Sequence, residues 1–231
     1  MGLTGAWGLI RDVVWPRGCA GCDEPDAVLC KRCSRRFAEV VPFAMPGTID
    51  GEGYACAWYR GAVRRAILGW KDHGDEECDD AFSALIRRLA TNCLSGRIHA
   101  SKNIWVIPAP SSAASLRRRG RWQTRVLARA VVDACHDMYS AADVMMVPAL
   151  VMRHVQGRSV QTHSGQRSQR VAGGVVMRRM PSCRGNDAII VDDIVTTGAT
   201  MRQCVETVNS AGLRTITCLA LACTPATGME P

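Results

Sequence analysis

Residues 188–200 read Ala188-Ile-Ile-Val-Asp192-Asp193-Ile-Val-Thr196-Thr197-Gly198-Ala199-Thr200. The apolar start predicts a buried strand, and the acids after it predict a strand end at the carboxyl edge of a sheet, where open α/β folds bind ligands. The small-residue loop 196–200 opens a predicted helix, so its N–H groups and hydroxyls suit a phosphate. Carboxylates just before such a loop fit a sugar phosphate; the alternative is an acidic strand end with an ordinary capped helix. The chain has no GxxxxGK[ST] motif, which excludes an NTPase P-loop.

Strand-like apolar runs alternate with amphipathic helical patterns along the rest of the chain. Strands are predicted at 54–59, 104–107, 148–153, 188–191 and 214–222, and helices at 62–70, 79–93 (capped by Asp79 or Asp80), 122–138 and 199–211. This alternation predicts an α/β fold, a parallel sheet flanked by helices. Pro42, Pro46 and residues 47–53 predict a linker. The linker divides an N-terminal segment, residues 1–50, from a main domain, residues 51–231.

Four of the twelve cysteines form two CxxC pairs, Cys19-Ala-Gly-Cys22 and Cys30-Lys-Arg-Cys33. Two such turns can close a sulfur tetrahedron around Zn²⁺, and the short polar sequence around them has too little apolar content to fold unaided. Because all four ligands are cysteines, no position stays open for catalysis, and we predict a small structural zinc ribbon with four cysteine ligands. Four reduced thiols are the alternative; a thioredoxin-like site is disfavoured because no strand precedes the pairs. The other eight cysteines are predicted to be core residues.

The composition is that of a globular protein: 231 residues, 47% hydrophobic and 22% charged, with a net charge of +8. No apolar run is long enough for a membrane span, and Arg11 and Asp12 interrupt the place of a signal peptide's apolar stretch, so a cytoplasmic protein without membrane insertion is predicted. Segments 109–132 and 144–186 hold Arg and no acid, whereas 72–80 holds six acids. Arg-rich segments suit a polyanion such as a phosphate ligand or nucleic acid, or form solvated helix faces.

Residues 188–200 resemble the phosphoribosyl-pyrophosphate (PRPP) motif of type I phosphoribosyltransferases. With the cysteine pairs, Lys71-Asp-His-Gly74-Asp75 and residues 106–123, nearly the whole chain resembles the ComF family, a competence-associated, phosphoribosyltransferase-like group with an N-terminal zinc ribbon. The resemblance implies that Asp192 and Asp193 are the catalytic acids, contacting the ribose hydroxyls and, indirectly, Mg²⁺. It implies a 5′-phosphate cradle made of Thr196, Thr197, Gly198, Ala199 and Thr200.

The resemblance also implies the rest of a PRPP site. A pyrophosphate loop would comprise Ala109, Pro110 and Ser111, with a further pyrophosphate contact from Lys71. Residues 157–170 would form a mobile hood over the ligand and would bind its anionic groups through Arg158, Arg167 and Arg170. The chain has Gly120-Arg-Trp122-Gln123 where the family typically has Gly-Phe-Asn-Gln, close to where an acceptor would enter, so the acceptor is not identified.

The sequence therefore supports two candidate functions. The first is a glycosyltransferase that binds PRPP with Mg²⁺ and transfers the phosphoribosyl group to an unidentified acceptor, releasing pyrophosphate. The second is a non-catalytic PRPP- or phosphate-binding protein of DNA uptake, which contacts DNA or a partner through its zinc ribbon and Arg-rich segments. A second copy of the chain is a further candidate partner. No general base is evident in the sequence.

Overall fold

The computed structural model describes residues 18–72, 75–98, 103–139, 143–153, 174–179 and 185–225. Six strands form one sheet in the order β1-β2-β8-β7-β3-β4, in which only the β1–β2 pair is antiparallel. The strands are β1 (Val41–Ala44), β2 (Glu52–Ala55), β3 (Ile104–Pro108), β4 (Val144–Met146), β7 (Asp187–Val195) and β8 (Arg214–Cys223). The predicted α/β class with a parallel sheet is confirmed.

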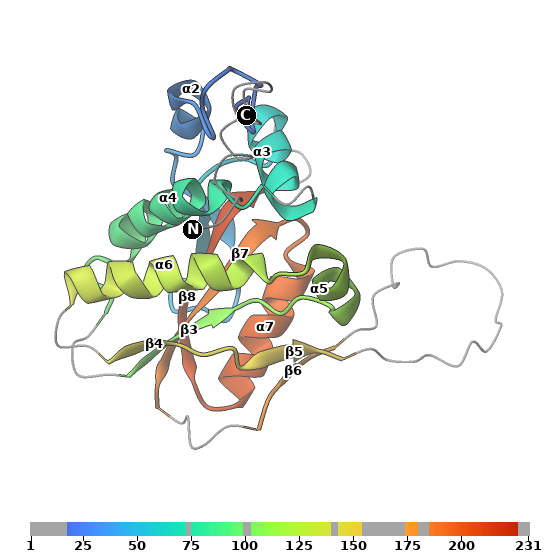
Figure 1. Cartoon of the computed structure of the whole chain (residues 1–231). Helices are drawn as coiled ribbons and strands as arrows, with labels where there is room; N and C mark the ends of the chain where they lie inside the picture. The colour runs from blue at the N-terminus through green and yellow to red at the C-terminus, as the bar shows by residue number, and fades with distance from the viewer. Residues whose placement is uncertain are drawn as a thin grey trace, which may run out of the picture.

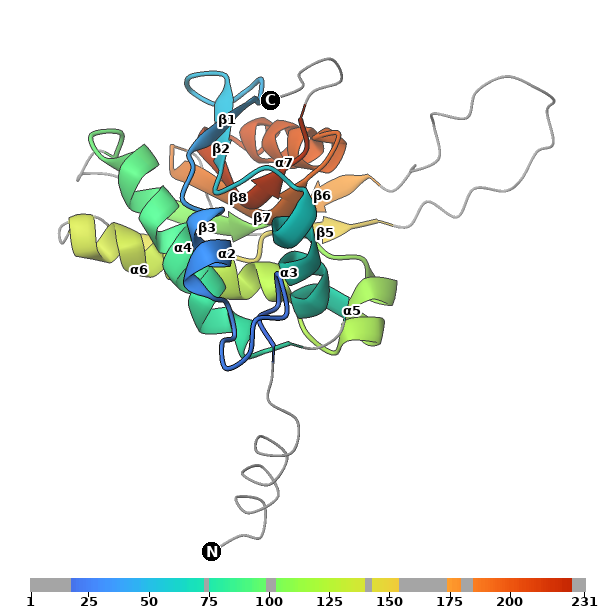
Figure 2. The same ribbon diagram turned by 90° about the horizontal axis from the view of Figure 1, so that it is seen from above.

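Helices cover both faces of this sheet (Figures 1 and 2). On one face, α3 (Gly61–Asp72), α4 (Cys78–Leu94) and α6 (Gln123–Met138) share a core that includes Ile67, Ile86 and Leu127. On the other face, α7 (Ala199–Ser210) packs Met201 and Val205 against the sheet. Shorter elements are α2 (Lys31–Arg35), α5 (Ala113–Arg119) and a separate antiparallel pair, β5 (Leu150–Met152) and β6 (Val175–Met177).

The chain changes direction along the sheet between β3 and β7. From β3 it runs through α5 and α6 to β4 on one side, and from β7 it runs through α7 to β8 on the other. The loops after β3 and β7 therefore diverge, and ligands of open α/β sheets bind in the crevice that such loops leave at the carboxyl edge. Pro108 pairs with Val191, so Ala109 and Asp192 follow in adjacent strands at this point.

Several strand predictions differ from the structure. The strand predicted at 54–59 is β2, at 52–55, and the strand predicted at 148–153 is β5, at 150–152, outside the six-stranded sheet. Val41–Ala44, within and beside the predicted linker, forms the edge strand β1, where Pro42 is tolerated because an edge strand needs no partner on its outer side. β7 is longer than predicted and continues through both acids to Val195, because β8 pairs with it along that length. The acid pair thus belongs to the strand itself and is held by the sheet.

Two side chains also differ from what their residue type suggests. An apolar side chain is usually buried, but Met145 is 43% exposed on the edge strand β4. The predicted cap of α4 was wrong: Glu77 takes the N-cap position, and Asp79 and Asp80 lie in the first turn. Asp79 instead accepts a hydrogen bond from Trp70 Nε1 at 2.6 Å, so its carboxylate ties α4 to α3.

Cysteines outside the CxxC pairs are core residues wherever the structure describes them. The buried ones are Cys56, Cys78, Cys93, Cys135, Cys204, Cys218 and Cys223; Cys183 lies outside the described residues. None of the described helices combines the length and hydropathy that crossing a bilayer requires.

Candidate functional site

Two carboxylates and a lysine meet at the carboxyl edge of the sheet. Asp192 and Asp193 are consecutive on β7, and the Asp193 backbone N–H donates to Asp192 Oδ1 at 2.8 Å. Lys71, at the end of α3, places its Nζ 2.7 Å from Asp193 Oδ2. Both side chains of this ion pair are largely shielded, being 14% and 10% exposed. The structure therefore brings Lys71 next to the two predicted acids, which lie far from it in the chain.

The surroundings of Asp192 favour its protonated form. Burial raises the pKa of the Asp192 carboxyl to about 8, and the neighbouring charge of Asp193 acts in the same direction. The hydrogen bond from the Asp193 backbone and the charge of Lys71 oppose this rise. A carboxyl group such as Asp192, with a raised pKa at the carboxyl edge of a sheet, is typical of a functional site, because a cationic or hydrogen-bonding ligand would relieve the cost of its charge.

The loop after β7 opens α7 in the way that the sequence predicts. Gly198 takes the N-cap position with φ of +72°, a conformation that favours glycine. Arg202, one turn into α7, folds back over the loop, and its Nη2 donates to the Thr197 carbonyl at 2.8 Å. Thr196, Thr197, Ala199 and Thr200 are exposed, so their polar groups and the N–H groups at the start of α7 are accessible to an anion.

The loop after β3 is anchored by the start of α6. The Ala109 carbonyl accepts hydrogen bonds from Trp122 Nε1 and Thr124 Oγ1, both at 3.1 Å, and its N–H donates to Val191 O at 2.8 Å. Pro110 and Ser111 follow Ala109 at the carboxyl end of β3, beside β7. The residues predicted for the pyrophosphate loop thus lie at the switch point of the sheet.

Helix α3 is fixed where it presents Lys71. Gln123 Nε2 donates to the Lys71 carbonyl at 3.2 Å, and Trp70 is fully buried with its ring 5.0 Å from that of Phe82. Because the Lys71 backbone and the neighbouring Trp70 side chain are both held, the position of the Lys71 Cα atom is well defined. This anchoring explains how a flexible side chain is directed at Asp193.

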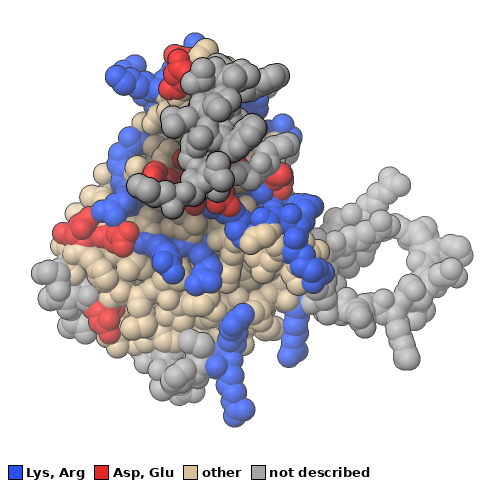
Figure 3. Space-filling view, viewed as in Figure 1, with Lys and Arg blue, Asp and Glu red and all other residues tan. Residues whose placement is uncertain are grey.

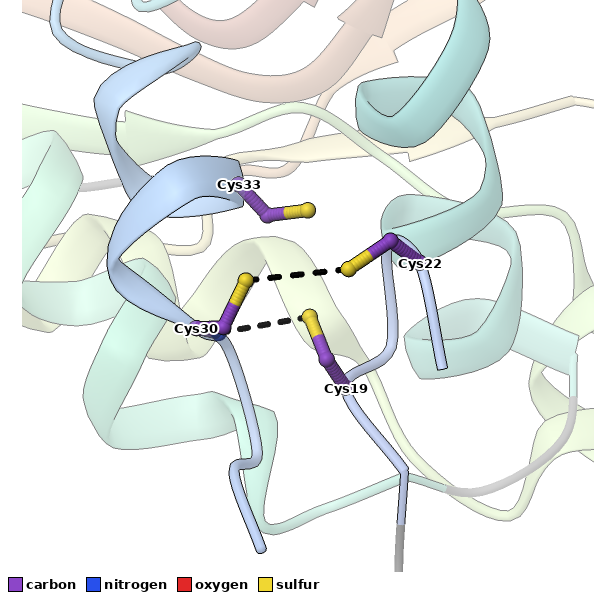
Figure 4. A group of neighbouring side chains, drawn as sticks. All are labelled: Cys19, Cys22, Cys30 and Cys33. Atoms are coloured by element: carbon purple, nitrogen blue, oxygen red, sulfur yellow. Dashed lines mark hydrogen bonds between the residues drawn. The ribbon is translucent and has the colours of Figure 1, made fainter. Parts of the chain in front are cut away.

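The four N-terminal cysteines point toward one another (Figure 4). Their sulfur atoms all lie within 4.8 Å of each other, and Cys22 Sγ lies 3.7 Å from Cys30 Sγ. Tetrahedral Zn²⁺ with Zn–S bonds of about 2.3 Å needs sulfurs about 3.8 Å apart, so the arrangement fits this metal. Backbone N–H groups of Cys30 and Gly21 donate to Cys19 Sγ at 3.2 and 3.4 Å. These two backbone donors hold the Cys19 sulfur in its place within the cluster.

Charges around the cluster also favour metal binding. The Arg32 guanidinium, 3.4 Å from Cys22 Sγ, is the main reason that the pKa of this thiol falls to about 6. The segment is attached to the main domain through α3: Arg65 Nε donates to the Gly21 carbonyl at 2.8 Å, and Ala62 packs against the cysteines. The same helix therefore contacts the cysteine cluster near its start and the acid pair near its end.

The acid-rich and Arg-rich segments partly neutralise each other, a pairing that the sequence analysis missed. Asp72 pairs with Arg118 and Arg119, and Arg121 pairs with Glu76 and Asp79. Figure 3 accordingly shows basic and acidic side chains next to one another on this face. Arg118, Arg119 and Arg121 are therefore in part structural, because they join α5 and the loop after it to the corner between α3 and α4.

Three residues of the predicted hood are not among those that the structure describes. These are Arg158, Arg167 and Arg170. Arg202 was not predicted as a site residue, although its position four residues after Gly198 puts it in the first turn of the helix that follows the loop.

Comparisons with known proteins agree with this geometry. Residues 128–231 match the family described as the phosphoribosyl transferase domain. A curated relative, transcriptional regulator GfcR 2 of Methanosarcina barkeri (strain Fusaro / DSM 804), is 32% identical over 56 residues. That match covers 24% of this chain and only 28% of the regulator.

Solved structures that are similar to the chain include the following phosphoribosyltransferases. The purine enzyme of Pyrococcus horikoshii Ot3 is 16% identical, with a TM-score of 0.37 over 63% of this chain and 76% of that one. A hypoxanthine enzyme of Staphylococcus aureus is 13% identical, with a TM-score of 0.38 over 66% and 70%. The orotate enzyme of Aeropyrum pernix is 14% identical, with a TM-score of 0.31 over 83% and 80%. On the strength of the family match, the chain is similar to phosphoribosyl transferase domains over the segment that carries the acid pair and the threonine loop.

Proposed function

We propose that the chain binds PRPP with Mg²⁺ across the carboxyl edge between β3 and β7 and transfers the phosphoribosyl group to a nucleophilic acceptor. The observation that carries this proposal is the acid pair on β7 directly before a threonine loop at a helix N-terminus, within the segment that matches the phosphoribosyl transferase domain. The family match covers less than half of the chain. The identity of the acceptor and the transfer reaction itself therefore belong to the proposal.

In the proposed complex each group has a task that its chemistry suits. The N–H groups and hydroxyls of residues 196–200 hold the 5′-phosphate. Asp192 and Asp193 accept hydrogen bonds from the ribose hydroxyls once Asp192 is ionised. Lys71 and the loop 109–111 face the pyrophosphate. Mg²⁺ prefers carboxylate, phosphate and water oxygens, and one or two carboxylates suffice beside a phosphate ligand, so the acid pair fits the metal, which would offset pyrophosphate charge.

The proposed reaction exchanges one bond for another at C1 of the ribose. The C1–O bond to pyrophosphate breaks, and pyrophosphate leaves with the electron pair. A lone pair of the acceptor forms the new bond to C1, and a proton carried by the acceptor nitrogen passes to solvent. The residues of the chain act mainly by positioning and by charge stabilisation of the leaving group.

We further propose that the cysteine cluster holds a structural Zn²⁺ and that the chain is of the ComF type. Support comes from the four sulfurs within 4.8 Å and from the Arg and N–H donors around them. Zinc would link α2 to the turn at Cys19–Cys22 and so stabilise the surface against which α3 packs. A measurement of zinc stoichiometry in purified protein tests this part of the proposal.

Calorimetric titration of PRPP with Mg²⁺ into zinc-replete protein tests the proposed site. Wild type is expected to bind, and the Asp192→Asn/Asp193→Asn double variant is expected to show no heat. Asp133→Asn, an exposed carboxylate on α6, serves as the matched control and should bind as wild type does. Absence of binding by folded, zinc-replete wild type would reject the proposal.

A second candidate is a DNA- or partner-binding role without turnover. It is favoured by exposed arginines on α5 and α6, Arg117, Arg125 and Arg129, and by the similarity to a transcriptional regulator. Several phosphate contacts would make DNA affinity fall steeply with salt concentration. A flat salt dependence, or no binding at low salt, would exclude this role.

A further inference from the structure

A pocket lies beside the threonine loop, on the side of β7 that faces β8 and away from β3. It has a volume of about 610 Å³, in the range of small-molecule sites, and is lined by the carboxyl ends of β7 and β8 and by residues of β1. Aromatic side chains of Phe43 and Trp58 form one wall, while Thr197, Gly198 and Arg202 form another. The threonine loop therefore belongs both to the proposed phosphate cradle and to this pocket.

The aromatic wall is fixed by backbone contacts. The Phe43 ring lies against Gly53, where an added Cβ would come 2.4 Å from Phe43 Cε2, so only glycine leaves room for it. Trp58 forms a parallel bridge with Cys223 at the end of β8, and the next residue, Tyr59, donates its N–H to the Cys223 carbonyl at 2.7 Å. Both rings are only partly buried, so each keeps surface toward the pocket. A planar aromatic ligand can stack on an aromatic side chain that is fixed in place and partly exposed.

The polar wall carries positive charge. Arg202 lies across Gly198, where an added Cβ would come 2.8 Å from Arg202 Nη1, so this glycine too makes room for the side chain that lines the pocket. Within the described part of the chain, Arg202 has no carboxylate within ion-pair distance, and the described lining contains no acidic side chain. A guanidinium without a protein carboxylate, in a pocket that is also lined by aromatic side chains, suits a ligand that combines a ring with an anionic group.

We propose that this pocket binds a planar aromatic anion, with the ring against Phe43 and Trp58 and the anionic group on Arg202. On the proposed function such a ligand would lie beside the 5′-phosphate cradle, because the threonine loop lines both, and this clause alone rests on that function. Binding in the pocket itself requires neither PRPP nor Mg²⁺. Four of its twelve lining residues, Pro42, Phe43, Ala44 and Trp58, lie outside the segment that matches the phosphoribosyl transferase domain.

Two probes that differ only in charge test the proposal, 1-naphthoate and 1-naphthamide, titrated calorimetrically into zinc-replete protein without PRPP. Because a charge-assisted hydrogen bond is stronger than a neutral one, naphthoate should bind about tenfold more tightly than naphthamide. Arg202→Gln should remove this preference and leave naphthamide binding unchanged. Phe43→Leu should weaken both probes to a similar degree. Arg64→Gln, an exposed arginine on α3, is the matched control and should change neither.

The outcomes separate this proposal from the function it extends. Equal affinity for the two probes, a preference that survives Arg202→Gln, or no binding of naphthoate to folded wild type would each overturn the pocket proposal. If naphthoate binds as expected while PRPP does not, the pocket stands and the transferase proposal falls. If PRPP binds while naphthoate does not, the reverse holds.

Discussion

Replacing Asp192 by asparagine should make the folded chain more stable in alkaline solution. The carboxyl of Asp192 lies beside that of Asp193, and burial raises its pKa from 3.8 to about 8. Asparagine has nearly the same shape, and its Oδ1 can still accept the hydrogen bond from the Asp193 backbone. The substitution therefore removes the cost of a charge and leaves the local geometry in place.

The sign follows from comparing the folded and unfolded chains. Between about pH 4 and pH 8 the unfolded chain has released the Asp192 proton while the folded chain retains it, so stability falls as pH rises through this window. One pKa unit corresponds to about 1.4 kcal/mol, which sets an upper limit of about 6 kcal/mol for the full rise. Because the side chain is partly exposed, solvent screening reduces the effect, and we expect Asp192→Asn to gain about 1–2 kcal/mol at pH 8.

Urea unfolding of zinc-replete protein at pH 5 and pH 8 measures this gain. Asp187→Asn, at the other end of β7, is the matched control because Asp187 is fully buried but accepts two hydrogen bonds from Arg214, each of 2.8 Å. This control should lose about 2 kcal/mol at both pH values. If Asp192→Asn is less stable than wild type at pH 8, or its gain is equal at both pH values, then Asp192 is ionised in the folded chain and the reasoning is wrong.

Three other substitutions test separate parts of the site. Lys71→Met removes the cation beside the acid pair, so the pKa of Asp192 should rise further and the onset of PRPP binding, followed by calorimetry between pH 6 and 9, should move to higher pH. Gly198→Ala puts a Cβ 2.8 Å from Arg202 Nη1 at a φ of +72°, which should cost about 1 kcal/mol in thermal unfolding and weaken phosphate ligands. Cys33→Ser removes one of four thiols and should abolish stoichiometric zinc, read by a colorimetric zinc assay, and lower the melting temperature.

Elements with strong periodicity could be predicted from the sequence. Helices α3, α6 and α7 begin and end within two residues of their predicted bounds, because amphipathic patterns and the breakers that flank them are local signals. The spacing of the two CxxC pairs likewise predicted a cluster that the structure brings together. Both predictions depend only on residues close to one another in the chain.

Contacts between distant segments could not be predicted in this way. The Lys71–Asp193 ion pair joins residues on α3 and β7, and nothing in either local pattern points to the other. The pairing of Asp72 with Arg119 depends in the same way on how α5 packs near the end of α3. The position of a strand at the sheet edge explains two further observations. Because β1 and β4 each have a neighbouring strand on one side only, Pro42 and the exposed Met145 are tolerated there.

The two halves of the chain contribute different kinds of groups to the carboxyl edge. The segment that matches the phosphoribosyl transferase domain supplies the acid pair and the threonine loop, whose backbone N–H groups suit a phosphate. The N-terminal half supplies the Lys71 charge and the aromatic rings of Phe43 and Trp58. A phosphate held by backbone groups is common to many ligands, whereas side-chain charge and aromatic surface distinguish one ligand from another. PRPP affinity should therefore respond to substitutions on both sides of residue 128, in the threonine loop and at Lys71, whereas binding of an aromatic ligand should respond to substitutions of Phe43 and Trp58.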